Sequence, residues 1–180
     1  GLILYLITLV FVKSLHELGH AFVSKYFGCR VSSIGIAFLV FFPFLYTDTS
    51  DAWRLRDHKD RLLINFAGIL TELHLALIST FLWAILPDGG LKSVAFFIAT
   101  TSWISSLAIN VSPFMRFDGY YVFSDWLKAE NLQPRSFALA RWQLREILFG
   151  FNHPPPEDLN PSRRWTFISY AWLTWVYRFF

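Results

Sequence analysis

Three long runs of apolar residues dominate the chain, and short polar segments separate them. Each run holds at least the roughly 20 residues that an α-helix needs to cross the hydrocarbon core of a membrane. The pattern therefore predicts membrane-spanning helices over residues 2–27, 62–86 and 91–111. A fourth run, residues 165–180, is expected to be the start of a further span that the sequence cuts off. We predict an all-α, multi-pass membrane protein with about four transmembrane helices.

The segments between these runs predict shorter elements. Residues 31–46 are apolar but too short to cross a bilayer, and Gly35 and Pro43 interrupt them. Because β-branched and aromatic residues dominate this stretch, we expect a short membrane-dipping β-hairpin or a re-entrant segment rather than a helix. Beyond the third span, the pattern predicts a short helix at 120–130 and an amphipathic helix at 135–149.

These elements divide the chain into three parts. Residues 1–130 form the predicted membrane core, residues 131–164 form a cytoplasmic amphipathic helix and loop, and residues 165–180 begin a further span. The chain starts and stops inside apolar runs, which we expect of a piece of a longer protein.

Composition supports a membrane protein and argues against a nucleic-acid partner. Hydrophobic residues make up 54% of the chain and charged residues only 16%, whereas soluble domains carry about 25% charged residues. Aromatic residues, at 19%, suit the interface between lipid and water. The net charge is +3, but the basic residues flank the apolar runs instead of forming one patch.

The distribution of basic residues predicts the topology. Lysine and arginine gather in the segment after the first span and in the segment after the third, whereas the turn between the second and third spans offers only Lys92. Cytoplasmic loops carry the excess of positive charge. We therefore expect both basic segments in the cytoplasm and the Gly89–Gly90 turn on the other side.

The first span carries a His-Glu-x-x-His motif. On a helix, His16 and His20 are one turn apart on the same face, so that both imidazoles can bind one metal ion. Glu17 lies beside them and can take a proton from a metal-activated water. The only cysteine is Cys29, which excludes an internal disulfide and a cysteine-based zinc site and is expected to be a buried filler.

A third ligand has to come from elsewhere in the chain, and a carboxylate is expected. Asp118 lies at the cytoplasmic end of the third span and precedes Gly119, which allows a tight backbone turn. Glu72 lies in the middle of the second span and would be deeper than the histidines. The residues themselves leave both candidates open.

The segment from Asn110 to Gly119 matches the motif Asn-x-x-Pro-x-x-x-x-Asp-Gly. Together with the earlier His-Glu-x-x-His, this pair of motifs resembles the site-2 protease family of intramembrane zinc metalloproteases. The resemblance covers most of residues 1–130 and is closest to the bacterial branch of peptide zinc metalloproteases. Members of that branch often sit in longer multi-pass proteins linked to secretion or efflux systems.

The resemblance implies a function and a site. It implies one zinc ion held by His16, His20 and Asp118, with Glu17 as general base and Asn110 holding the substrate or stabilising the oxyanion. The activity would be hydrolysis of peptide bonds in membrane-embedded or membrane-bound substrates. The protein would be a multi-pass component of the bacterial inner membrane, with its active site toward the cytoplasm.

This sequence departs from the family pattern in places that concern substrate choice. Met115-Arg116-Phe117 stands where many members have a second proline. Glu72 follows Gly68 by one turn, where many members have a small or amide residue. There is no inserted PDZ-like module.

Two charged residues near the motif have alternative interpretations. Lys13 shares the helix face of the motif. It either tunes the site or pairs with Glu17 in the metal-free state, or else it is a snorkelling lysine or one paired with Glu72. Glu72 either supports a metal ligand or makes a structural contact between helices, and we favour the structural contact. His58 falls in a polar loop, where we expect it to be solvated.

Three other functions stay open from the sequence. A catalytically idle relative would serve as a secretion or efflux component of the membrane. A transporter with a structural zinc would need a closed site with a fourth protein ligand. A soluble metalloprotease would bury the apolar runs in its own core.

Overall fold

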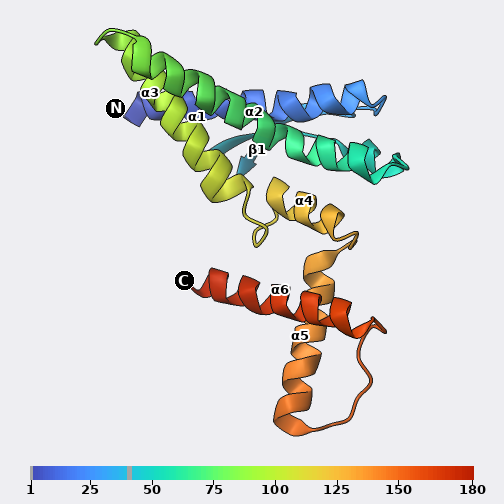
Figure 1. Ribbon diagram of the computed structural model, residues 1–180. Helices are drawn as coiled ribbons and strands as arrows, with labels where there is room; N and C mark the ends of the chain where they lie inside the picture. Colours follow the sequence, from blue (N-terminus) through green and yellow to red (C-terminus); the bar gives the residue numbers. More distant parts are fainter. Residues whose placement is uncertain (1, 40–41) are drawn as a thin grey trace. The chain divides into compact units, whose positions relative to one another are not determined.

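The computed structural model describes residues 2–39 and 42–180, which form two compact units divided between Asp125 and Trp126. The first unit contains helices and a two-stranded sheet (Figure 1). The second unit consists of helices alone in its described secondary structure.

Three helices of the first unit are long and apolar enough to cross a membrane, which supports the three predicted spans. They are α1 (Leu2–Tyr26), α2 (His58–Ile85), and α3 (Gly90–Trp103) together with its π-helical continuation η2 (Ile104–Asn110). Helix α1 ends where predicted, because Gly28 adopts the left-handed conformation with φ +75°. Helix α2 begins four residues earlier than predicted, because the Asp57 side chain accepts a hydrogen bond from the Lys59 amide and caps it.

Helices α1, α2 and α3 pack against one another (Figure 1). Small residues at their contacts allow this close approach. Gly19 of α1 faces α2 so closely that a Cβ atom there would lie 2.2 Å from Thr71 Oγ1. Ala67 and Ala76 of α2 and Ala99 of α3 are buried. The packing brings the face of α1 that carries the motif against α2.

The segment predicted as a hairpin or re-entrant loop is a β-hairpin. Strand β1 (Ile34–Leu39) pairs antiparallel with β2 (Phe42–Thr47), with Ile34 opposite Thr47. Residues 40 and 41 of the predicted segment lie outside the described residues. The Thr47 hydroxyl donates to the Glu17 carbonyl at 3.0 Å, which fixes the end of β2 on α1 beside the motif.

The chain reaches the site again through η2 and α4 (Asp118–Trp126), the short helix predicted at 120–130. The Val111 amide donates to the Ser106 carbonyl at 2.9 Å, five residues back, which is the wide turn of a π-helix. A Cβ atom at Gly119 would lie 2.4 Å from the Val111 carbonyl oxygen. Only glycine therefore allows α4 to start directly against the end of η2. A short 3-10 helix, η1 (Ser50–Arg54), precedes α2.

The second unit packs α5 (Leu132–Phe149) against α6 (Pro161–Phe179). Leu132, Leu139 and Phe167 are among its buried residues. The Arg135 Nε atom donates to Glu157 at 2.9 Å, and this guanidinium holds the pKa of the Glu157 carboxyl below its usual value. The amphipathic helix predicted at 135–149 corresponds to α5.

The fourth predicted span is not confirmed. Helix α6 contains the segment predicted as its start but begins at Pro161, and it is not among the described helices apolar enough to cross a membrane. The reason lies in its composition, because Arg163, Arg164 and Arg178 offset the apolar side chains. The all-α prediction holds for most of the chain, and the hairpin adds a small sheet.

Candidate metal centre

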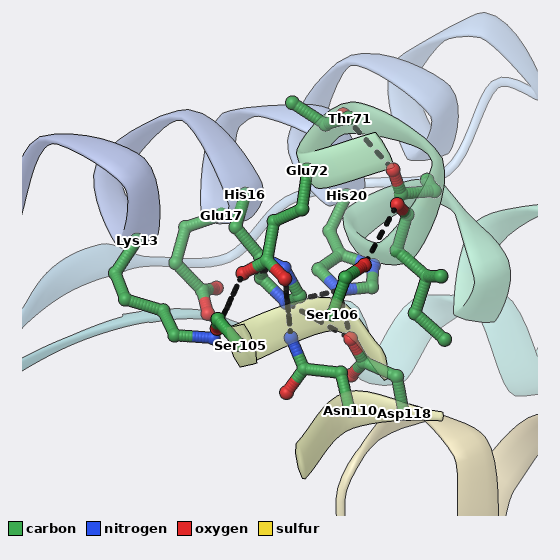
Figure 2. A network of polar contacts seen from close by, with 12 residues as sticks. Lys13, His16, Glu17, His20, Thr71, Glu72, Ser105, Ser106, Asn110 and Asp118 are labelled. Carbon is green, nitrogen blue, oxygen red and sulfur yellow. Dashed lines mark hydrogen bonds and ion pairs between the residues drawn. The ribbon is translucent and has the colours of Figure 1, made fainter. Parts of the chain in front are cut away.

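Residues from α1 and α4 converge on one point in the first unit (Figure 2). The Nε2 atoms of His16 and His20 lie 3.2 Å apart. The Asp118 Oδ2 atom, from the first residue of α4, lies 2.9 Å from His16 Nε2 and 3.4 Å from His20 Nε2. The structure thus brings together the three side chains predicted as metal ligands.

The other nitrogen of each imidazole contacts an acceptor. His20 Nδ1 lies 2.8 Å from the Ile64 carbonyl oxygen, and His16 Nδ1 lies 3.0 Å from Glu72 Oε1. Because a carbonyl and a carboxylate can only accept, each Nδ1 is the nitrogen that carries the proton. In the neutral rings both Nε2 atoms therefore present lone pairs to the Asp118 carboxylate.

Three lone-pair atoms so close together repel one another unless a cation lies between them. Their separations of 2.9, 3.2 and 3.4 Å match one face of a tetrahedron whose ligand bonds are about 2.0–2.1 Å long, as for zinc. Asp118 Oδ2 is buried and makes no hydrogen bond within the part of the chain that the structure describes. The donor set of two imidazoles and one carboxylate therefore fits a zinc ion with one coordination position left open.

Helix α2 provides the surface against which both imidazoles pack, at Gly68. A Cβ atom there would lie 2.4 Å from His16 Nε2 and 2.5 Å from His20 Nε2. Any larger residue would displace the rings. The sequence shows Gly68 only as a glycine inside a span, and nothing in its local pattern indicates this contact.

Glu72 is fully buried and joins three elements around His16 (Figure 2). Its Oε1 atom accepts from Lys13 Nζ at 2.8 Å and from the Ser105 hydroxyl at 3.2 Å, in addition to facing His16. Its Oε2 atom accepts from the Asn110 amide at 2.9 Å. The pairing of Lys13 with Glu72 is therefore the interpretation that the structure bears out.

The preferred interpretation of Glu72 as a contact between helices was incomplete. Its carboxylate does bridge α1, α2 and η2, but it also contacts the ring of His16. It does not belong to the group of three converging donor atoms. The wide π-helical turns of η2 direct Ser105 and Asn110 toward α2, where both donate to Glu72.

Two cavities meet at the site. A polar cavity of about 340 Å³ extends toward the loop after β2 and the start of α2, with Thr47, Asp48, Arg61 and Asn65 in its wall. An apolar cavity of about 460 Å³ lies between α1, β2 and η2, with Tyr5, Leu9, Leu45 and Ile104 in its wall. Glu17 and Asp118 are the two residues that line both.

A cluster of polar contacts that the sequence did not predict holds α4 against α2. The buried Asp125 carboxylate accepts from Arg61 Nε at 3.0 Å and from the Asn65 amide at 2.7 Å. Burial raises the pKa of the Asp125 carboxyl above its usual value, although Arg61 opposes the shift. His58 was expected to be solvated, but it is half-buried and its ring contacts the Asp125 carbonyl.

Comparison with known proteins gives one match, to a family model over residues 2–110. The model of Peptidase family M50 matches residues 2–110, which is more than half of the chain and includes the His-Glu-x-x-His motif. The match ends at Asn110, so that the assignment of Asp118 depends on the geometry above. No curated protein and no solved structure gave a match. The chain belongs to peptidase family M50, the site-2 protease family of membrane-embedded proteases.

Proposed function

We propose that this protein is a zinc-dependent intramembrane endopeptidase. It would hydrolyse peptide bonds in membrane-embedded or membrane-bound protein and peptide substrates. The observation that carries the proposal is the convergence of His16, His20 and Asp118, three donor atoms within 3.4 Å of one another. The family match and the three apolar helices support a protease that works in a bilayer.

The residues of the candidate centre would hold one zinc ion through His16 Nε2, His20 Nε2 and Asp118 Oδ2. When bound there, zinc supplies a Lewis acid that activates water and polarises a peptide carbonyl. The Ile64 carbonyl and the Glu72 carboxylate keep both imidazoles in the tautomer and orientation that this requires.

Glu17 is the residue placed to move protons. It follows His16 directly on α1 and lines both cavities at the point where they meet. In the proposed reaction its carboxylate takes a proton from the attacking water and then passes this proton to the leaving amine. The polar cavity gives water a route to Glu17, which hydrolysis needs.

Asn110 contributes an amide beside the reacting groups. Its Nδ2 atom donates to Glu72 Oε2 at 2.9 Å and also lies 3.5 Å from His16 Nδ1. Asn110 also lines the apolar cavity, where a substrate backbone would lie. We propose that it holds the substrate or stabilises the developing oxyanion.

The location of the site is part of the same proposal. The basic segments after the first and third spans favour a site that opens toward the cytoplasm. The resemblance to the bacterial branch is the basis for placing the protein in a bacterial inner membrane. Nothing in the described residues bears on a secretion or efflux partner.

Two variants test the proposal directly. Glu17→Gln keeps the three donor atoms but removes the base, so we expect full zinc content and a loss of cleavage of at least about 100-fold. His16→Ala removes a ligand, so we expect loss of both zinc and cleavage. Metal analysis of the purified protein and a cleavage assay in lipid measure the two outcomes.

The same pair of variants separates the proteolytic proposal from its main alternative. A catalytically idle relative would show no difference between wild type and Glu17→Gln in any peptide assay. Wild-type protein that purifies without zinc and cleaves nothing after zinc is added back would contradict the proposed enzyme.

A further inference from the structure

Helix α1 and strand β2 both pass from the apolar cavity to the polar cavity. On α1, Tyr5 and Leu9 line the apolar cavity and His20 lines the polar one. On β2, Leu45 lines the apolar cavity and Thr47 lines the polar one. Along α1 and β2, the cavity wall therefore changes from apolar to polar within a single turn of α1 and two residues of β2.

The change of environment coincides with the reacting groups. Glu17 and Asp118 are the two residues shared by the cavities, and the hydroxyl of Thr47 bonds to the backbone of Glu17. A peptide that lies along this path has its apolar part on one side of Glu17 and its polar part on the other.

We propose that the enzyme selects peptides at a junction between an apolar run and a polar run and cleaves them at that junction. This inference depends on the proposed proteolytic function and specifies its substrate class. The apolar run lies between α1 and η2, against Leu9 and Ile104. The polar residues lie against the loop after β2 and the start of α2, where Asp48, Arg61 and Asn65 offer partners.

The length of the apolar cavity determines how many apolar residues of the substrate peptide it can hold. From Tyr5 to Glu17 helix α1 rises by about 18 Å, at about 1.5 Å per residue. An extended peptide advances about 3.3 Å per residue. The cavity therefore holds about five residues next to the scissile bond. Lys13 and Ser105 also line it, but both already donate to Glu72. A polar side chain among the five would lose its water and gain no partner from Leu9 or Ile104.

A series of peptides with a moving junction tests this inference on the reconstituted wild-type protein. Each peptide carries one Leu/Ala run and one Ser/Asn run, at constant total length, and the junction moves by two residues from one peptide to the next. A second series has the two runs in the opposite order. Mass spectrometry of the products gives the position of each cut.

We expect the cut to move with the junction in at least one of the two series, and peptides with fewer than about five apolar residues to be cleaved at least about tenfold more slowly. A cut at a fixed distance from a terminus, or cuts scattered through the apolar run, would overturn the junction rule while leaving the protease intact. Failure to cleave any peptide, at full zinc content, would instead contradict the proposed function and this inference with it.

A matched pair of α1 variants tests the apolar cavity itself. Leu9→Gln adds a polar group inside the cavity, and Ile7→Gln adds the same group on the exposed, lipid-facing side of the same helix. Compared at equal zinc content, the pair controls for the cost of an extra amide in α1. We expect Leu9→Gln to lower kcat/KM for the apolar-run peptides by about tenfold, mainly through KM, and Ile7→Gln to change it by less than about twofold.

Equal losses in the two variants would overturn the role of the cavity. If Leu9→Gln fails to assemble, as judged by its zinc content, Leu9→Ala provides the same comparison with Ile7→Ala. In that case the larger cavity should favour bulkier apolar residues in the peptide, and an unchanged preference would count against the inference.

Discussion

At the scale of single residues, Gly68 fixes the distance between α2 and the candidate metal centre. An added Cβ atom would lie 2.4 Å from His16 Nε2 and 2.5 Å from His20 Nε2, closer than such contacts allow. We therefore expect Gly68→Ala to weaken zinc binding by at least about 10–100-fold, as for other changes next to metal ligands. Zinc titration of the purified protein measures this loss.

Helix α2 should stay folded in Gly68→Ala, so that a loss of zinc affinity reports on the contact with the imidazoles. Alanine favours helix over glycine by about 1 kcal/mol, so that α2 itself gains stability. Gly90→Ala is the matched control, because a Cβ atom at Gly90 meets no atom within 4 Å. Unchanged zinc affinity in Gly68→Ala would show that the imidazoles are not held against α2 as described.

The buried carboxylate of Glu72 is the second single residue for which we expect an effect on zinc binding. Glu72→Gln keeps the size of the side chain but removes the charge that faces His16 Nδ1 and pairs with Lys13. We expect zinc affinity to fall by about 10–100-fold, because the ligand imidazole becomes less basic and less firmly oriented. Competition with a chromophoric chelator measures the change.

The control for Glu72 lies half a turn away on the same helix. His74 is exposed and its ring contacts only the Leu70 carbonyl of its own helix among the interactions described, so that His74→Gln should leave zinc affinity unchanged. If Glu72 serves only to join the helices, Glu72→Gln will lower thermal stability while zinc affinity stays at the wild-type value.

The sequence predicted some of these residues better than others, for a physical reason. His16 and His20 belong to one helical turn, so that their spacing alone places them together. Glu72 lies on another helix, and its contact with His16 depends on how far α1 and α2 are rotated about their axes. A one-helix pattern carries no information on that rotation, and therefore the two interpretations of Glu72 could not be separated.

At the scale of elements, α4 carries Asp118 at its first residue and is fixed at its other end by Asp125. The Asp125 carboxylate accepts from Arg61 and Asn65 of α2 and is largely buried. Asp125→Ala leaves Arg61 without this partner, and we expect a loss of about 2 kcal/mol in stability. Zinc affinity should fall as well, because α4 no longer holds Asp118 firmly.

The readout for Asp125 has to distinguish position from general stability. The visible spectrum of the cobalt-substituted protein reports the geometry around the metal, and we expect it to change in Asp125→Ala. Asp88→Ala removes an ion pair with Lys92 in which the Asp88 side chain is almost fully exposed, and it should change neither stability nor spectrum. An unchanged spectrum in Asp125→Ala would refute a positioning role.

The elements themselves were largely predictable, and their junctions were not. Long apolar runs, the stop at Gly28 and the Gly89–Gly90 turn determine where α1, α2 and α3 lie, because length and turn residues decide these boundaries locally. The π-helical turn in η2 and the contact of Asp125 with α2 arise from packing between elements. Neither leaves a periodic signal in the sequence, and for this reason neither was foreseen.

At the scale of the whole molecule, the first unit buries many polar side chains among its small apolar ones and exposes large apolar side chains on its surface. Glu72, Ser102 and Ser106 are fully buried, whereas Ile3 and Phe22 of α1 are 75% and 71% exposed. A soluble domain shows the opposite arrangement, with charged groups almost never fully buried. In lipid, exposed apolar side chains carry no penalty and internal polar groups join the helices, which argues against the alternative of a soluble metalloprotease.

This arrangement gives zinc a structural consequence in the proposed enzyme. Its three ligands come from α1 and α4, which are far apart in the sequence, so that the ion ties both ends of the first unit together. A ligand that binds only the folded protein stabilises it by about 4 kcal/mol when its free concentration is 1,000 times Kd. We therefore expect a chelator to lower the unfolding temperature of wild-type protein by several degrees and zinc to restore it.

His16→Ala provides the comparison that assigns the shift to this site. The variant lacks a ligand, so it should unfold near the temperature of chelated wild type and should not respond to chelator or to added zinc. Limited proteolysis should also cut wild type between η2 and α4, at residues 111–117, faster after chelation, because α4 then loses the link that the ion makes between Asp118 and α1. If chelation shifts wild type and His16→Ala equally, the ion acts elsewhere on the molecule, and the link between α1 and α4 does not depend on it.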